Sequence, residues 1–231
     1  MADGADAGDR EERAEFGERA RREPRWPASI AVFVAIALQI ALPERLDLGP
    51  RWLIPSLEAT LELALVVSRP MRRGRDPGRL RVVAIGLIAL INAANLVSLG
   101  YLVHDLLYPK STAISGRALV YASVPVWLTN IIVFALWYWE LDRGGPARRA
   151  TDRRRAPDFL FPQMTAPGAV VGDWSPSFLD YCYTSFTNVT AFSPTDTMPL
   201  TAWAKLLMAT QALASLLTVA LVVSRAVNIL A

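Results

Sequence analysis

The sequence predicts an all-α fold: a polytopic membrane helical bundle with five clear transmembrane helices and a short polar aromatic helix, re-entrant or a sixth span. Hydrophobic residues fill 53% of the 231 positions and charged residues only 19%, whereas soluble domains average about 45–50% and about 25%. Six arginines gather in each of three stretches, 3–25, 69–81 and 140–158. Apolar runs of about 20 residues, the length that crosses a bilayer, separate these stretches.

The composition also excludes several classes of protein. The single cysteine, Cys182, leaves no intramolecular disulfide and no multi-cysteine metal site. The single histidine, His104, leaves little from which to assemble a catalytic triad or a zinc site, so we expect no enzyme activity, no cofactor and no metal. The arginines lie beside apolar runs without interleaved aromatic residues, so they indicate membrane topology and not a nucleic-acid partner.

Each segment of the chain follows from its residue pattern. Residues 1–25 alternate acids with arginines and form a polar cytoplasmic tail. Residues 26–139 form a four-helix transmembrane region, with tryptophans at several helix ends as in an interfacial belt. The four apolar segments cover 26–43, 52–68, 82–103 and 118–139. Residues 140–172 form an arginine-rich loop and linker, and residues 173–231 hold the short helix, a turn and a final transmembrane helix at 203–224.

The distribution of basic residues sets the orientation. From the tail to the loop after the fourth segment, the polar stretches carry six, two, six, two and six basic residues. Cytoplasmic loops hold the excess of Lys and Arg, so the N-terminus is expected in the cytoplasm. Arginine outnumbers lysine by 22 to two, a bias that looks bacterial. We therefore expect a bacterial inner (cytoplasmic) membrane protein whose partner is the lipid bilayer, with a homo-oligomer left open.

The stretch from 156 to 204 differs from the rest of the chain, because it holds four aspartates and no basic residue. Ser175 and Pro176 provide a hydroxyl cap and a proline for the start of a helix, and Ser193-Pro194 ends it. The segment between them is too polar to face lipid. Of the alternatives, a re-entrant helix or a crossing, we expect a full or near-full crossing, which places the C-terminus inside.

Two acids in the second apolar segment are the main candidates for function. Glu58 and Glu62 are four residues apart, so both carboxylates lie on one helix face. An ionised carboxylate in hydrocarbon is costly, so such a pair usually faces a cavity, shares a proton or binds a cation. The alternatives are an interfacial position for this segment, or two protonated acids that hydrogen-bond locally.

Other polar residues complete a candidate polar path. Membrane asparagines most often bridge helices, and a lining role beside the acids is the alternative. The turn before the last helix is either a plain helix-breaking turn or a polar constriction. These residues are Asn92, Asn95, Asn130, Ser193, Thr195 and Asp196. Gln39 is expected to bridge helices, and Glu140 and Asp142, which lie among arginines, are expected to form surface salt bridges.

Four segments carry a resemblance to a known family: LTNIIVFALWY (128–138), PDFLFP (157–162), FLDYCYTSF (178–186) and SPTD (193–196). They resemble the bacterial membrane family called domain of unknown function 1345, over roughly the C-terminal half of the chain. The family is uncharacterised, so the resemblance implies membership and no chemistry. The region after 178 is also faintly similar to the pore module of potassium channels, but AFSPT (191–195) stands where the selectivity filter would be, so potassium selectivity is not implied.

Two functions remain open from the sequence. One is a channel- or transporter-like protein for protons or small cations. The alternative is a non-conducting membrane scaffold or interaction protein, in which the polar residues only hold the helices together.

Overall fold

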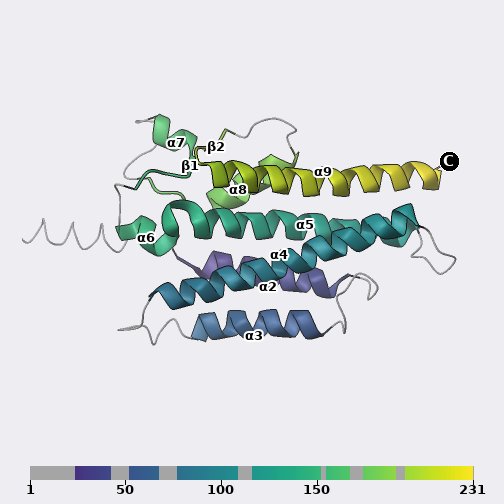
Figure 1. Ribbon diagram of the computed structural model, residues 1–231, viewed down its shortest axis with the longest axis horizontal. Coiled ribbons are helices and arrows are strands. Elements are labelled where there is room, and N and C mark those ends of the chain that lie inside the picture. The colour runs from purple at the N-terminus through teal and green to yellow at the C-terminus, as the bar shows by residue number, and fades with distance from the viewer. Residues whose placement is uncertain are drawn as a thin grey trace, which may run out of the picture.

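The computed structural model confirms the all-α fold. It describes residues 24–42, 52–67, 77–108, 116–151, 155–166, 174–190 and 196–230. The long helices lie side by side: α2 (Trp26–Ile40), α3 (Leu53–Val67), α4 (Pro77–Leu107), α5 (Gly116–Leu141) and α9 (Ala202–Leu230) (Figure 1). The central helix is α5, which packs against α2, α4, α8 and α9, whereas α3 contacts α4 and α2 at one edge of the bundle.

The chain between the end of α5 and the start of α9 forms several short elements. They are the 3-10 turn η2 (Asp142–Gly144), α6 (Pro146–Thr151), β1 (Phe159–Leu160), α7 (Pro162–Thr165), α8 (Phe178–Thr190) and β2 (Met198–Pro199). The two strands pair antiparallel, with Phe159 opposite Pro199. This pairing brings the segment before α9 back beside the segment that follows α5.

Three helices in the described part of the chain are long and apolar enough to cross a bilayer: Leu80–His104, Val120–Gly144 and Ala202–Ser224. Spans of 25, 25 and 23 residues measure roughly 35–38 Å at 1.5 Å per residue, more than the hydrocarbon thickness. Helices α2 and α3 have 15 residues each, or about 22 Å. Three of the five expected spans thus have the necessary length, and the other two are shorter helices.

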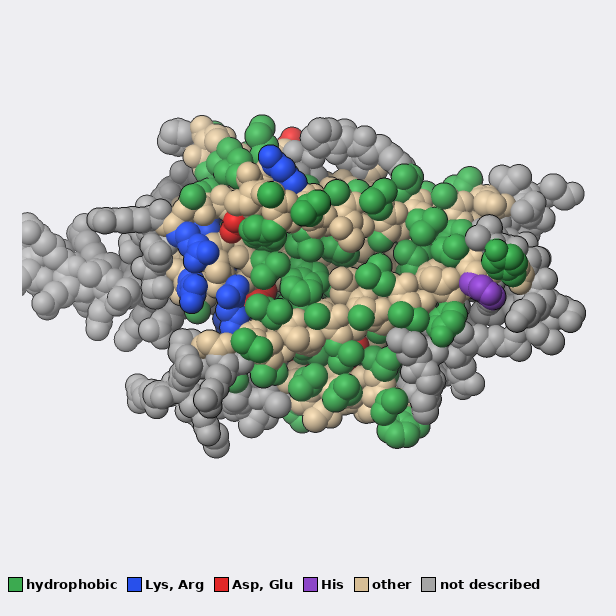
Figure 2. Space-filling view, in the orientation of Figure 1, with side chains coloured by type: hydrophobic (Ala, Val, Ile, Leu, Met, Phe, Trp, Pro, Cys, Tyr) green, Lys and Arg blue, Asp and Glu red, His purple; other side chains and the backbone are tan. Residues whose placement is uncertain are grey.

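The helices alternate in direction, so the bundle has two distinct ends. Arg25 at the start of α2 lies over the Trp139 ring at the end of α5, with 5.8 Å to the ring centroid. Arg81, near the start of α4, contacts Glu140 of α5. We call this the arginine end. It also carries Arg143 and Arg149, which contact Asp142 and the Trp139 carbonyl, and Arg148 and Arg155, which lie beside Gly144. Basic side chains gather at this end, and the single histidine lies at the opposite end (Figure 2). Helices α2, α4 and α9 run away from the arginine end, and α3 and α5 run toward it.

The short helix α8 starts at the arginine end and does not cross the bundle. Tyr181, in its first turn, bonds to Asp142 at the end of α5. After α8 the chain is already back at this end by Thr197, whose hydroxyl accepts from that of Thr184 at 3.2 Å, and the Leu200 amide donates to the carbonyl of Asp158 at 2.8 Å. The expected full crossing is therefore wrong: the chain enters α8 and returns from it at the same end of the bundle, and α9 then runs toward the opposite end (Figure 1).

The start of α8 also lies two residues later than its sequence suggests. The backbone N–H and the hydroxyl of Ser177 both donate to Asp180 Oδ2, at 2.7 Å each. This is one half of a capping box, in which an acid three residues into the helix accepts from the backbone N–H of the serine before it. The expected cap at Ser175 with Pro176 in the first turn is therefore wrong, because Asp180 selects Ser177 as its partner.

Candidate functional site

Glu58 and Glu62 lie on the inner face of α3, as their spacing predicts. Their exposed fractions are 0% and 3%, whereas Leu57 and Leu63 beside them in the sequence are 48% and 58% exposed. A helix at the edge of the bundle would ordinarily turn its leucines inward. Here exposed apolar residues of α3 face outward and the carboxylates face the neighbouring helices.

The Glu58 carboxylate is buried, and few polar groups replace the hydrogen bonds that it would form with water. Neither of its oxygens forms a hydrogen bond of good geometry with any described residue. The side chain that interacts with it is the amide of Gln39 on α2, which is 6% exposed and whose nitrogen has no other described partner. Burying such groups without full hydrogen bonds costs free energy, so the pair is a place where a proton or a small cation would be stabilised.

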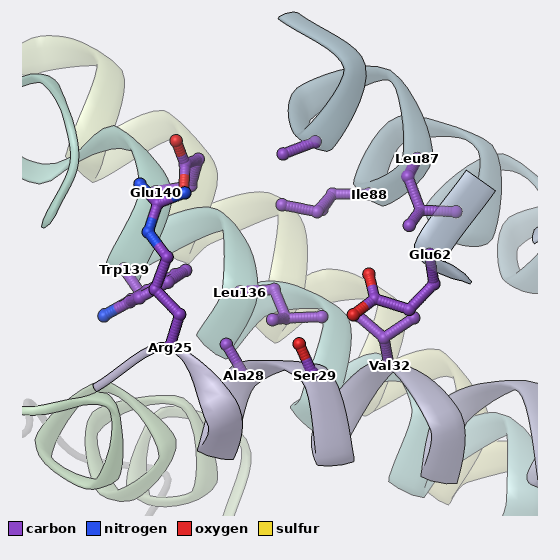
Figure 3. A pocket seen from close by; sticks show the side chains of 11 residues that line it. Arg25, Ala28, Ser29, Val32, Glu62, Leu87, Ile88, Leu136, Trp139 and Glu140 are labelled. Carbon is purple, nitrogen blue, oxygen red and sulfur yellow. The ribbon is translucent and has the colours of Figure 1, made fainter. Parts of the chain in front are cut away.

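Glu62 lines a cavity of about 50 Å³ whose walls come from α2, α3, α4 and α5 (Figure 3). The walls are mostly apolar, with contributions from Val32, Leu87, Ile88 and Leu136. The Glu62 carboxylate points into the cavity near Ser29, and Arg25 and Glu140 stand at the other side (Figure 3). The cavity therefore joins an acid in the middle of the bundle to the arginine end.

Glu140 and Asp142 are not at the surface. Their exposed fractions are 1% and 0%, so the expectation of surface salt bridges is wrong for both. Glu140 Oε1 lies 3.4 Å from Arg81 Nε, and Asp142 Oδ2 lies 3.4 Å from Arg143 Nε. The chain turns back over the end of α5 immediately after these acids, through Arg143 with a φ of 51° and two glycines with positive φ, and this turn buries them.

The other predicted residues fall in different places. Asn95 on α4 is 2% exposed, and Asn92 has a buried amide oxygen without a described partner. Asn130 on α5 donates to the backbone oxygen of Gln211 on α9 at 3.4 Å, so it bridges two helices. Asp196 is exposed at the arginine end, while Ser193 and Thr195 lie outside the described residues. Glu58 and Glu62 on α3 are thus remote from the contact that Asn130 makes with α9.

The structure also contains a hydrogen-bonded network between α5, α8 and α9, which the sequence analysis did not predict. Its centre is Gln211, which is 0% exposed. Its Oε1 accepts from the Tyr138 hydroxyl at 2.5 Å and from Asn188 Nδ2 at 2.8 Å, and its Nε2 donates to Ser185 Oγ at 2.6 Å. Gln211, Ser215 and Thr218 are all buried and recur at helical spacing in the last apolar segment, a signal that could have identified this face.

A second group joins acids and aromatic rings at the arginine end. Asp142 Oδ2 accepts from the Tyr181 hydroxyl at 2.6 Å, and Asp142 Oδ1 accepts from the Asp158 amide at 2.9 Å. Asp158 in turn accepts from the indole N–H of Trp203 at 3.0 Å. The Phe159 ring packs among these aromatic residues, 5.0 Å from the Tyr138 ring. The segments 128–138, 157–162 and 178–186, which carry the family resemblance, therefore meet in space.

Comparisons with protein-family models, with curated proteins and with solved structures give no match for this chain. Within the described ranges, no three His, Cys, Asp or Glu residues are grouped so that they could hold a metal ion. The chemistry that the site offers is that of two buried carboxyl groups, an amide and a cavity. This set can bind and release a proton or a small cation.

Proposed function

We propose that this chain is a multi-pass integral membrane protein that moves protons or small cations, with Glu58 and Glu62 as the groups that bind them. The observation that carries the proposal is the burial of both carboxylates on the inner face of α3, with Glu58 lacking a described hydrogen-bond partner of good geometry. Ionisable groups at such depth in a membrane protein are costly and mark ion or proton pathways. The three helices of bilayer-crossing length support the membrane setting.

In the proposed orientation the arginine end faces the cytoplasm of a bacterial cell, as the excess of arginine in its loops favours. Helices α4, α5 and α9 cross the bilayer, and α2 and α3 complete five spans, with Trp26 and Trp52 exposed at their starts as interfacial anchors. With α8 re-entrant from the cytoplasmic side, the C-terminus lies outside the cell.

Membership of the family called domain of unknown function 1345 is part of the proposal. It rests on the sequence resemblance of residues 128–138, 157–162, 178–186 and 193–196 to that family. This family assignment adds no substrate to the proposal.

The proposal is tested by flux in proteoliposomes. A pH-sensitive dye reports proton entry under an imposed gradient, and the same vesicles are assayed with sodium and potassium gradients. We expect the wild type to conduct, and Glu58→Gln with Glu62→Gln to abolish flux. Thr60→Val is the matched control, since Thr60 lies on the exposed face of the same helix and donates only to the Ser56 carbonyl. Flux that survives the double substitution contradicts the proposal.

The second candidate is a non-conducting scaffold. The observation that favours it is the Gln211 network, which bonds α9 to α5 and α8 in the manner of helix-bridging polar residues. A scaffold needs no charge on α3, so both acids would be protonated and Gln would replace them without loss. Absence of wild-type flux together with unchanged stability of the double variant would favour this candidate.

A further inference from the structure

We infer that the transported species is the proton, and that Glu62 exchanges it with the arginine end through the cavity beneath Arg25 and Glu140. This inference rests on the proposed function and adds the substrate class and the side of access. Helix α3 runs toward the arginine end, so Glu62 is one turn closer to that end than Glu58. Glu62 lines the cavity, and Glu58 does not.

The cavity has the size of a short water-filled passage, with apolar walls between polar groups at its two sides. Its volume of about 50 Å³ accommodates roughly three to five water molecules, given the 10–15 Å³ that each requires. Polar groups stand at both sides of it, with Ser29 and Glu62 deep in the bundle and Arg25 and Glu140 toward the arginine end (Figure 3). Water in such a space has several polar partners, which a buried water needs.

The charged groups between the cavity and the arginine end favour protons over metal cations. Arg25, Arg81 and Arg149 all act electrostatically on the Glu140 carboxylate, and the Arg81 side chain is 30% exposed. A sodium or potassium ion that entered here would pass these guanidinium groups, and like charges at close range repel strongly where water is scarce. A proton carries the same charge, but it binds covalently to the Glu140 carboxylate and neutralises it. A sodium or potassium ion would instead need several oxygen ligands, which the mostly apolar walls do not supply.

Glu58 is then the second proton-binding group, after Glu62. The charged groups that face Glu62 are Arg25 from the start of α2, Glu140 from α5 and Glu58 from its own helix, with Arg81 of α4 behind Glu140. The Cβ atoms of residues four apart on a helix lie about 5–6 Å from one another, so one water or side chain can bridge the two carboxyl groups. A proton received by Glu62 therefore passes to Glu58, where the Gln39 amide faces it.

The test is carbodiimide labelling with the pH set separately on the two sides of the membrane. Dicyclohexylcarbodiimide enters apolar sites and reacts with the protonated acid: the carboxyl oxygen bonds to the central carbon, the carboxyl proton moves to a nitrogen, and the adduct rearranges to an N-acylurea with no leaving group. Proteoliposomes with a single orientation are used, verified by trypsin cleavage of the arginine-rich loops. Mass spectrometry of the peptide that holds both acids then gives the labelled fraction of each.

We expect Glu62 labelling to disappear when the arginine side is made alkaline and to be unaffected by the pH on the opposite side. Ser29→Leu, which extends a side chain into the cavity, should slow the labelling, whereas Ser29→Ala should not. Glu62→Gln should prevent labelling of Glu58. Labelling that follows the pH of the opposite side overturns the inference and leaves the proposed function standing. Labelling of neither acid at any pH overturns both.

Discussion

Replacing Gln211 with Leu should reveal how much the buried network between α5, α8 and α9 contributes to stability. Gln211 is fully buried and accepts from Tyr138 and Asn188 while donating to Ser185. Leucine has nearly the same volume, so the substitution removes hydrogen bonds without opening a large cavity.

The magnitude follows from what each partner retains. Ser185 still donates to a backbone carbonyl of α5, and Asn188 still donates to one of α9. The Tyr138 hydroxyl is 0% exposed, and its proton is left with no acceptor, because the neighbouring Asn188 amide can only donate to it. Four hydrogen bonds of the Gln211 side chain are lost, including one to the Ser185 carbonyl. At about 0.6 kcal/mol each, the average in membrane proteins, they total about 2 kcal/mol. The unpaired hydroxyl adds about 1–2 kcal/mol, so Gln211→Leu should cost about 3–4 kcal/mol.

A double-mutant cycle isolates the unpaired hydroxyl. Tyr138→Phe alone should cost about 1 kcal/mol, because Gln211 keeps Asn188 and Ser185. In the double variant no donor is left unpaired, so the loss should fall short of the sum by about 1–2 kcal/mol. The assay is denaturant titration in detergent micelles, followed by tryptophan fluorescence. Losses that add to within about 0.5 kcal/mol would refute the reasoning. Thr218→Val is the control partner, since Thr218 donates only to the Ala214 carbonyl of its own helix and should be additive with Tyr138→Phe.

Two further substitutions test the turn that closes the arginine end, with the same titration as the measurement. Asp142→Asn should cost about 2–3 kcal/mol of stability, because the new amide hydrogens would face the Asp158 amide and the Tyr181 hydroxyl, which donate to the wild-type carboxylate. Its control is Asp196→Asn at an exposed position, which should change stability by less than about 0.5 kcal/mol. Gly145→Ala should cost about 1–3 kcal/mol, because φ is +95° and the added Cβ would lie 3.0 Å from a carbonyl oxygen. Gly86→Ala, where a Cβ meets nothing within 4 Å, should stabilise the helix by about 0.5–1 kcal/mol. Equal effects for the members of either pair would contradict these assignments.

The long apolar helices were predictable because their signal is local. An apolar run of 20 or more residues is visible in one dimension, and the expected segments 82–103, 118–139 and 203–224 lie within α4, α5 and α9. The same holds for the inner face of α3, because a spacing of four residues places two acids together on any helix. These predictions needed no knowledge of which helices are neighbours.

The wrong predictions concern features that depend on contacts between segments distant in the sequence. Prolines lie near both ends of the α8 sequence and predicted a short helix there. Nothing local indicates that β2 pairs with β1, since each strand has only two residues. Glu140 and Asp142 lie in a charged stretch that reads as surface, and their burial depends on Arg143 and two glycines in positive φ. Gln211 is one polar residue in an apolar run, and its importance comes from helices that are 20 or more residues away in sequence.

The distribution of polar groups divides the bundle into two unlike halves on either side of α5. Toward α8 and α9, Gln211 and its neighbours form mutual hydrogen bonds, so any displacement of α9 against α5 would break several of them. Toward α2 and α3, Glu58 and Gln39 are buried with incomplete hydrogen bonding, and the cavity beside Glu62 leaves space between the helices. Packing that is already incomplete loses little when it rearranges, whereas a satisfied network resists rearrangement. If the carboxylates exchange protons, the movement that accompanies this exchange should therefore occur in α2 and α3, with α5, α8 and α9 as the fixed part against which they move.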